Sequence, residues 1–202
     1  MREALRYLRL SGAAFAATVT ACVCLQPGDV MTHNGLSFYG NFQQTLLPYG
    51  LGLGLTALAL LRASQHMPQA AVGRGLRLSL SAMAAALLGV VVTPSFAQNW
   101  LIQLLHVLFA AMVFVLQLAV SWRATHLRTG QLDHWLFRVQ LGALAVAMLS
   151  FGTFGALSLM LPAQALAIAS FGALLLRTLQ REPDAATRWV TAPVRATPPR
   201  KL

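Results

Sequence analysis

Acidic residues are almost absent from this chain, which has 5 Asp and Glu against 15 Lys and Arg in 202 residues. Charged residues of either sign make up 10% of the sequence, whereas a soluble domain usually carries about 25%. Asp29 is the only charged residue between residues 10 and 61, and residues 78–122 and 139–176 contain none. Because charge is costly in hydrocarbon, this distribution predicts an all-α polytopic membrane protein. The lack of carboxylates in the apolar stretches also argues against transport coupled to ions through such a group.

Cysteine is equally scarce, since Cys22 and Cys24 are the only two. Residues two apart on a helix point about 200° apart, so the pair does not indicate a disulfide. The simplest interpretation is small apolar helix residues, with a redox or metal pair as the alternative. Residues 19–22 also resemble a permissive bacterial lipobox, which would make Cys22 a lipidated residue rather than part of an ordinary first helix.

The sequence lacks the motifs of several common classes of enzyme and nucleotide-binding protein. The sequence contains no G-x-S-x-G, H-E-x-x-H or P-loop. His106 is the only histidine within an apolar span, which argues against a haem held by two axial histidines, and no other cofactor is indicated. The net charge of +10 does not predict nucleic-acid binding, because the basic residues flank apolar stretches and no recognition motif accompanies them.

The three apolar stretches predict six spans. Each is too long for one transmembrane helix of about 20 residues and sufficient for two. Each also has a turn signal near its middle, at Pro27-Gly28, at Thr93-Pro94-Ser95 and at Leu161-Pro162. We therefore expect three helical hairpins in a bundle over residues 1–182, with spans at about 10–25, 45–61, 78–93, 99–121, 139–158 and 162–177.

All 15 Lys and Arg residues fall on one side of this topology, and the three turns on the other side hold none. The positive-inside rule then predicts that both termini are cytoplasmic. Residues 183–202 are basic and rich in proline, which predicts a disordered tail. The absence of N-glycosylation sequons is compatible with a bacterial inner membrane, where membrane lipids are the expected partners.

The fourth predicted span carries polar residues along one face. At 100° per residue they fall within an arc of about 60°; they are Asn99, Gln103, His106, Gln117 and Ser121. Lipid does not satisfy such groups, so we expect this face to point into the bundle. It can line a path for a ligand or a proton, or it can supply hydrogen bonds between helices.

The second predicted span has a matching face made of Thr45, Tyr49, Gly52 and Thr56. Small residues at this spacing indicate a packing seam, with the fourth span as a candidate neighbour. In the alternative interpretation, Tyr49 and His106 share a cavity that opens outward.

The first outer loop, residues 26–48, is the longest and most polar of the predicted turns. Its candidate ligand-binding residues are Asp29, His33, Asn34, Tyr39 and Asn41. Loops with such polar and aromatic groups commonly carry recognition, although Phe38 and Tyr39 could instead anchor the loop at the membrane interface. A metal ion held by Asp29, His33 and His106 is a weaker alternative, because their spacing is not diagnostic, and no metal site is predicted.

The segment from Gly35 to Asn41, followed by Leu47-Pro48-Tyr49-Gly50, resembles uncharacterised small bacterial six-helix membrane proteins of the DRAM-like type. The resemblance extends to six spans with a long first outer loop and implies no catalytic residue.

Three functions remain open from the sequence. The first is binding or movement of a lipid or small amphiphile through the polar face and the first outer loop. The second is a membrane enzyme in which His106 acts as a general base, assisted by Asp29 or His33. The third is an accessory or scaffold subunit whose fifth span, with Gly142, Gly152 and Gly155, faces a partner helix.

Overall fold

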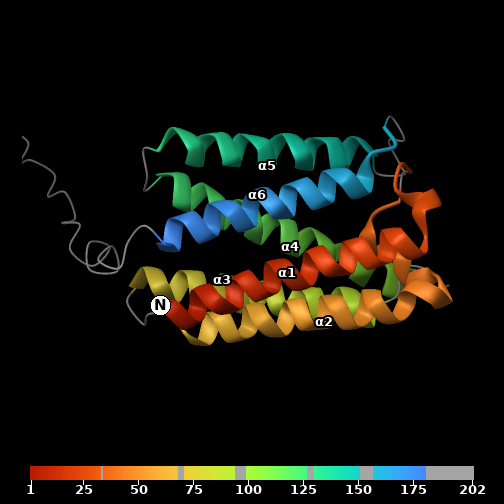
Figure 1. The fold of residues 1–202 in the computed structure, drawn as a ribbon, viewed down its shortest axis with the longest axis horizontal. Helices are drawn as coiled ribbons and strands as arrows, with labels where there is room; N and C mark the ends of the chain where they lie inside the picture. Colours follow the sequence, from red (N-terminus) through yellow and green to blue (C-terminus); the bar gives the residue numbers. More distant parts are fainter. Residues whose placement is uncertain (33, 68–70, 94–98, 127–129, 151–156, 181–202) are drawn as a thin grey trace, which may run out of the picture.

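The computed structural model describes residues 1–32, 34–67, 71–93, 99–126, 130–150 and 157–180, and these residues form helices and no strands. Six α-helices follow one another along the chain (Figure 1): α1 (Arg2–Leu25), α2 (Gln43–Gln65), α3 (Ala71–Val92), α4 (Trp100–His126), α5 (Gln131–Ser150) and α6 (Met160–Gln180). Two short 3-10 helices, η1 (Pro27–Asp29) and η2 (Leu36–Asn41), lie between α1 and α2. The all-α prediction is confirmed.

Five of these helices, α1, α2, α3, α4 and α6, are long and apolar enough to cross a membrane. Over the described residues α5 does not reach the same mean hydropathy, because Asp133, His134 and Arg138 lie in its first two turns. The predicted fifth span also includes residues 151–156, which lie outside the described part of the chain. Large apolar side chains such as Leu55, Leu108 and Val115 are exposed on the outer surface. These features indicate a multi-pass membrane protein.

Most helix ends near the basic residues extend beyond the predicted spans, as at the starts of α1, α3 and α5 and the ends of α2, α4 and α6. α1 starts at Arg2 rather than near residue 10, because its first turns are amphipathic: Ala4 and Leu8 are buried while Arg2, Arg6 and Arg9 are exposed. The proline expected to mark the last turn, Pro162, instead lies in the first turn of α6, where its missing N–H costs no helical hydrogen bond.

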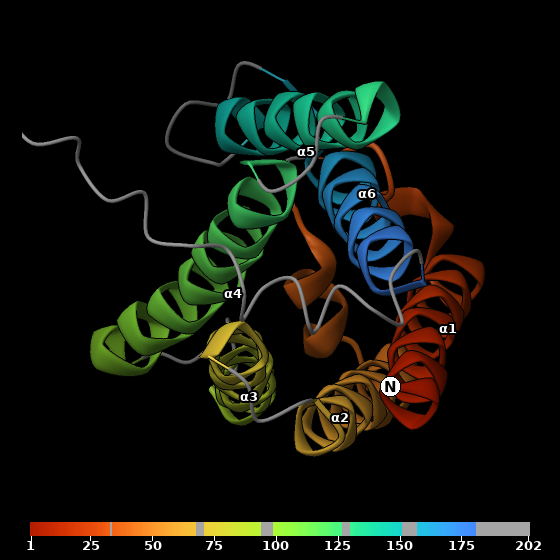
Figure 2. The same ribbon diagram turned by 90° about the vertical axis from the view of Figure 1, so that its left-hand side faces the viewer.

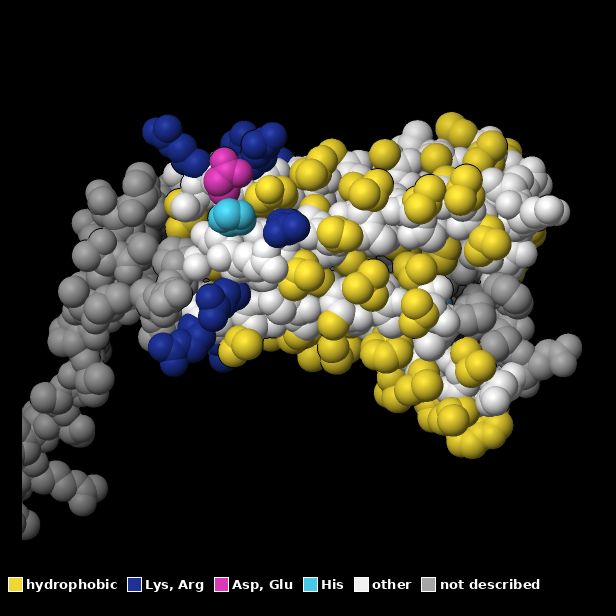
Figure 3. All heavy atoms as spheres, turned by 90° about the horizontal axis from the view of Figure 1, so that it is seen from below, with side chains coloured by type: hydrophobic (Ala, Val, Ile, Leu, Met, Phe, Trp, Pro, Cys, Tyr) yellow, Lys and Arg dark blue, Asp and Glu magenta, His cyan; other side chains and the backbone are white. Residues whose placement is uncertain are grey.

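Arginines gather at one end of the bundle, which we call the basic end. α1 begins there and α6 ends there (Figure 1). In Figure 3 the Lys and Arg side chains on the visible face cluster at this end, whereas the rest of that face is largely apolar. The arginines come from the starts of α1, α3 and α5 and the ends of α2, α4 and α6: Arg2, Arg6, Arg9, Arg62, Arg74, Arg77, Arg123, Arg138 and Arg177.

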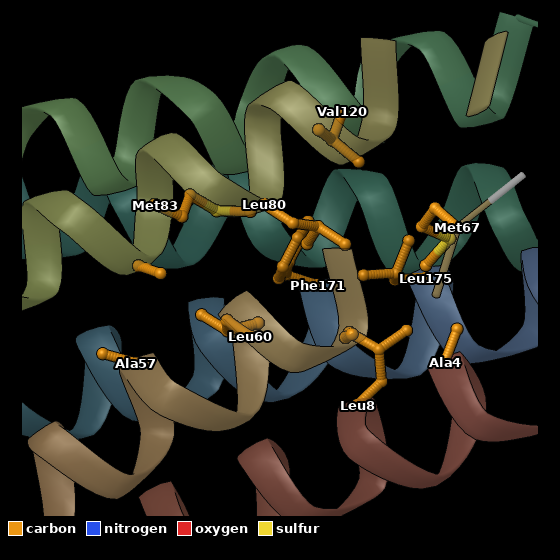
Figure 4. Close-up of a cluster of buried hydrophobic side chains, with 12 residues drawn as sticks. Ala4, Leu8, Ala57, Leu60, Met67, Leu80, Met83, Val120, Phe171 and Leu175 are labelled. Atoms are coloured by element: carbon orange, nitrogen blue, oxygen red, sulfur yellow. The ribbon is translucent and has the colours of Figure 1, made fainter. Parts of the chain in front are cut away.

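Two apolar clusters fill the bundle. The cluster nearer the basic end joins α1, α2, α3, α4 and α6 around Leu80, Met83 and Phe171 (Figure 4). The second cluster lies toward the opposite end and includes Tyr39 of η2 and Tyr49 of α2. Seen along the helices, the orange segment between α1 and α2 lies inside the ring of helices (Figure 2).

The predicted seam on α2 is a packing face, since Thr45, Tyr49 and Thr56 are all buried. Its neighbours are α1 at Gly52 and η2 at Thr45 and Tyr49, and not the fourth span. A Cβ atom at Gly52 would overlap the Thr18 side chain of α1. Glycine at this point therefore lets the two helix backbones approach closely.

A buried ion pair joins α5 to α6 near the basic end. Arg177 Nε lies 3.1 Å from Asp133 Oδ1, and the Asp133 side chain is 2% exposed. Gly130 packs against the same carboxylate, so Asp133 is enclosed by the start of its own helix and by α6. Removal of either partner would leave a charge without its counter-ion.

Replacement of Gly52 with alanine should lower the stability of the fold by about 1–3 kcal/mol, because the new methyl group forces α1 and α2 apart. The unfolding midpoint of the purified protein in mild detergent measures the effect. Gly54→Ala is the matched control, since no described atom lies within 4 Å of a Cβ at that position. Equal midpoints for the two variants would contradict the close-approach role of Gly52.

Candidate functional site

The polar face of α4 divides into an exposed part and a buried part. His106, Gln117 and Ser121 are buried, as expected for a face that points into the bundle. Asn99 and Gln103 are exposed, contrary to that expectation. They lie in the turn where α4 starts, beyond the reach of the neighbouring apolar clusters.

Asn99 has a local structural role. Its Oδ1 accepts a hydrogen bond of 2.9 Å from the backbone N–H of Leu101, as a residue that caps a helix N-terminus does. The backbone N–H groups of Ile102 and Gln103 in turn bond the Asn99 carbonyl. Asn99 therefore stabilises the start of α4.

His106 is tied to the end of α3. Its Nδ1 bonds the backbone carbonyl of Thr93, and because a carbonyl only accepts, Nδ1 carries the proton. In the neutral ring Nε2 is then an acceptor. Thr93 Oγ1 lies 3.5 Å from the same Nδ1 and donates a 2.6 Å bond to the Gly89 carbonyl. The sequence marked Thr93 only as a turn residue, so this pairing was missed.

Gln117 and Ser121 carry polar atoms that the described part of the chain leaves without a hydrogen-bond partner. These atoms are Gln117 Oε1 and Ser121 Oγ, and both residues are buried. An unpaired polar group in apolar surroundings costs about 2–7 kcal/mol. This part of the α4 face is therefore suited to a polar group that is not supplied by the described residues.

Gln140 of α5 is a third buried residue with unpaired polar atoms, and it was not predicted from the sequence. Its side chain is fully buried, and both ends of its amide lack a partner among the residues described. The available signal was that Gln140 is one of two glutamines, with Gln164, in the charge-free stretch of residues 139–176. α5 packs mainly against α6 and also against α4, and these two helices cover its buried side.

The first outer loop packs into the end of the bundle opposite the basic end. Leu36, Tyr39 and Gly40 of η2 are buried, and Tyr39 is completely inaccessible to solvent. The Tyr39 ring fills the second apolar cluster and does not reach the outer surface as a membrane-interface anchor would, whereas its role in ligand binding stays a prediction. η2 closes this end of the bundle between α1, α2, α3 and α6.

Specific contacts hold η2 in place. The Leu36 N–H donates a 3.0 Å bond to Gln164 Oε1 of α6, and a Cβ at Gly35 would collide with the same side chain. Thr45 Oγ1 of α2 donates to the carbonyl of Tyr39. The role of Gln164 was not predicted from the sequence, because its partner Leu36 lies far away along the chain.

The other candidate loop residues remain near the surface. Asp29 is half-buried and accepts a 3.2 Å bond from Gln26 Nε2. Asn34 is half-buried and Asn41 is exposed, whereas His33 lies outside the described residues. Burial raises the pKa of Tyr39 above its ordinary value, and the negative charges of Asp29 and then Cys22 add to this effect.

Tyr49 and His106 have different neighbours. The Tyr49 ring packs against Gly40 of η2, and its hydroxyl lies near Ser37. His106 bonds Thr93 at the end of α3. A cavity shared by the two residues stays a prediction. Among the residues described, no group of three or more His, Cys, Asp and Glu is placed to hold a metal ion.

Comparison with protein-family models, curated proteins and solved structures finds no match for this chain. The resemblance to DRAM-like proteins therefore remains an expectation from the sequence, and the site has to be interpreted from its own chemistry.

Loss of the Thr45 hydroxyl should make η2 open more often. Cys22 is buried beneath η2 in the second apolar cluster, whereas Cys24 is exposed. In a Cys24→Ser background, Thr45→Val should raise the rate of Cys22 alkylation by a membrane-permeant maleimide about 2- to 10-fold, as expected for loss of one hydrogen bond.

Thr20→Val makes the same chemical change at an exposed position of α1 and should leave the rate unchanged. The anchoring role of Thr45 would be refuted by equal alkylation rates in the two variants.

Proposed function

We propose that this chain is a six-span protein with both termini in the cytoplasm, of a bacterial inner membrane, which binds or moves a lipid or small amphiphile. Its ligand contacts the polar face of α4 and enters from the end that η2 closes. The basic end then lies at the cytoplasmic surface, where arginines meet anionic headgroups.

The buried polar atoms of α4 are the observation that carries this proposal. Gln117 Oε1 and Ser121 Oγ point into a bundle whose described interior leaves them unpaired. Lipid tails cannot satisfy them, whereas the polar group of an amphiphile can. The apolar surroundings of the same face, including Val113 and Val120, suit the acyl part of such a molecule.

The first outer loop supports the proposal because η2 covers the end of the bundle through which the ligand would enter. η2 is a short segment held by the burial of Leu36 and Tyr39 and by single hydrogen bonds to Gln164 and Thr45. Segments with few such bonds open at low free energy, as binding-site lids do. In this proposal the loop residues act by controlling access and not by recognising the ligand at the surface.

An accessory-subunit role is the second candidate, and α5 favours it. Gly142 lies on an exposed face of α5, and no described atom comes within 4 Å of a Cβ placed there. Trp135 and Leu149, one heptad before and after, are exposed on the same face. This face suits a partner helix; Gly152 and Gly155 lie outside the described residues.

A membrane enzyme that uses His106 has less support. Hydrogen bonding to the Thr93 carbonyl occupies Nδ1, and the ring is buried. Only Nε2 is then available as a base, and neither Asp29 nor any other carboxylate is seen to orient the ring within the described structure.

The ligand-binding role predicts a loss of bound lipid in Gln117→Leu. This change removes the unpaired oxygen and preserves side-chain volume, so the fold should persist while affinity falls about 10-fold. Mass spectrometry of the full-length protein, purified in mild detergent, compares the retained small molecules with those of the wild type. Gln65→Leu, at an exposed position near the basic end, is the control. Retention of the same molecule by Gln117→Leu would count against this site.

The proposed topology has the C-terminus in the cytoplasm, so a C-terminal reporter that works only in the cytoplasm should be active. Paired fusions of a fluorescent protein and a periplasmic phosphatase in a bacterial host provide the measurement. We expect fluorescence and no phosphatase activity; the opposite pattern would overturn the six-span orientation.

A further inference from the structure

The position of Gln140 relative to α4 defines a deeper part of the proposed site. Trp122 of α4 and Phe137 of α5 are ring neighbours with centroids 5.9 Å apart, so they mark the same level of the bundle. α4 runs toward the basic end and α5 runs away from it. At 1.5 Å per residue, Gln140 lies about 4.5 Å beyond this level, between Ser121 at about 1.5 Å and Gln117 at about 7.5 Å.

We propose that Gln140, Gln117 and Ser121 form a subsite that selects an uncharged headgroup able both to donate and to accept hydrogen bonds, such as a free hydroxyl or an amide. This inference rests on the proposed function and names the chemical class of its ligand. Neither the α4 stripe nor the first outer loop alone specifies that class.

The unpaired donors and acceptors of Gln140 and Gln117 determine which headgroup the subsite can bind. Gln140 presents an unused N–H₂ and an unused carbonyl oxygen, and Gln117 presents an unused oxygen, as far as the described chain extends. A ligand with acceptors alone, such as an ester or a quinone, would leave both amide oxygens unpaired. A hydroxyl or an amide can satisfy an oxygen and an N–H₂ together. Because both ends of the Gln140 amide are unpaired, the ligand needs a donor and an acceptor whichever way that amide is turned.

The surroundings favour an uncharged group. Arg138 of α5 and Arg123 of α4 lie two residues from Gln140 and Ser121, but both arginines are exposed on the opposite sides of their helices. The nearest buried charge along α5 is Asp133, which is bonded to Arg177. Asp133 lies seven residues before Gln140, or about 10 Å along the helix. A charged headgroup at this depth would lack a counter-ion, and its burial would be costly.

The probes that test this idea are 1,2-dioleoylglycerol, which has a free hydroxyl, and its 3-O-acetyl derivative, which has acceptors only. Binding of each to the full-length protein in mild detergent is measured by native mass spectrometry. We expect the wild type to favour the free hydroxyl about 10-fold or more. Gln140→Leu should abolish this preference, whereas Gln131→Leu, an exposed glutamine on the same helix, should retain it.

A stability measurement separates a ligand site from ordinary packing. Without added lipid, Gln140→Leu should unfold at the same temperature as the wild type or a few degrees higher, because it removes an unpaired buried amide. A Gln140 that holds helices together would instead give a lower midpoint in the variant, and this result would overturn the subsite.

The binding results distinguish the two proposals. If the wild type binds both probes equally and Gln140→Leu does the same, the selective subsite is refuted while the proposed function stands. If the wild type binds neither these probes nor any co-purified amphiphile, the proposed function fails and the subsite fails with it.

Discussion

Hydrocarbon offers no hydrogen-bond partner to a polar side chain, and the arrangement of this bundle follows from that constraint. The arginines of the described helices collect at one end, and many small polar residues in the helices bond their own backbone. The hydroxyl groups of Thr18, Thr56, Thr93, Ser150 and Ser170 each donate to the carbonyl four residues earlier, at 2.6–2.8 Å. Such bonds let a polar residue lie in an apolar helix without a partner on another helix.

Because many hydroxyl groups bond their own backbone, the buried polar side chains that stay unpaired are informative. Ser121 could reach the carbonyl of Gln117 by the same geometry, yet its hydroxyl stays unpaired in the described structure. The two glutamines nearby have longer side chains that could bond a neighbouring helix, as Gln164 does when it accepts the N–H of Leu36. Unpaired atoms also occur elsewhere in the described chain, as at Tyr39 and Tyr49, but Gln117, Ser121 and Gln140 lie on two helices that pack together. These three residues are therefore the ones on which the proposed ligand site rests.

Much of the fold could be predicted from charge and hydropathy, because exclusion of charge from hydrocarbon is a property of composition. Helix ends were less predictable, since Arg2 to Arg9 continue α1 on an amphipathic face. The burial of His106 and Gln117 was predictable, because one helix carries both residues on the same face. Gln140, Gln164 and Thr93 were missed because their significance depends on which helices pack together, and η2 was read as a surface loop because burial of Tyr39 requires contacts with α1, α2 and α3.

The ion pair between Asp133 and Arg177 has a consequence for biogenesis. α5 begins with a buried carboxylate, and its counter-charge lies near the end of α6, which the ribosome makes later. A nascent α5 emerging alone would present an uncompensated charge together with a modest apolar run. The buried pair can form only after Arg177 has been synthesised, so the packing of α5 has to wait for the end of α6.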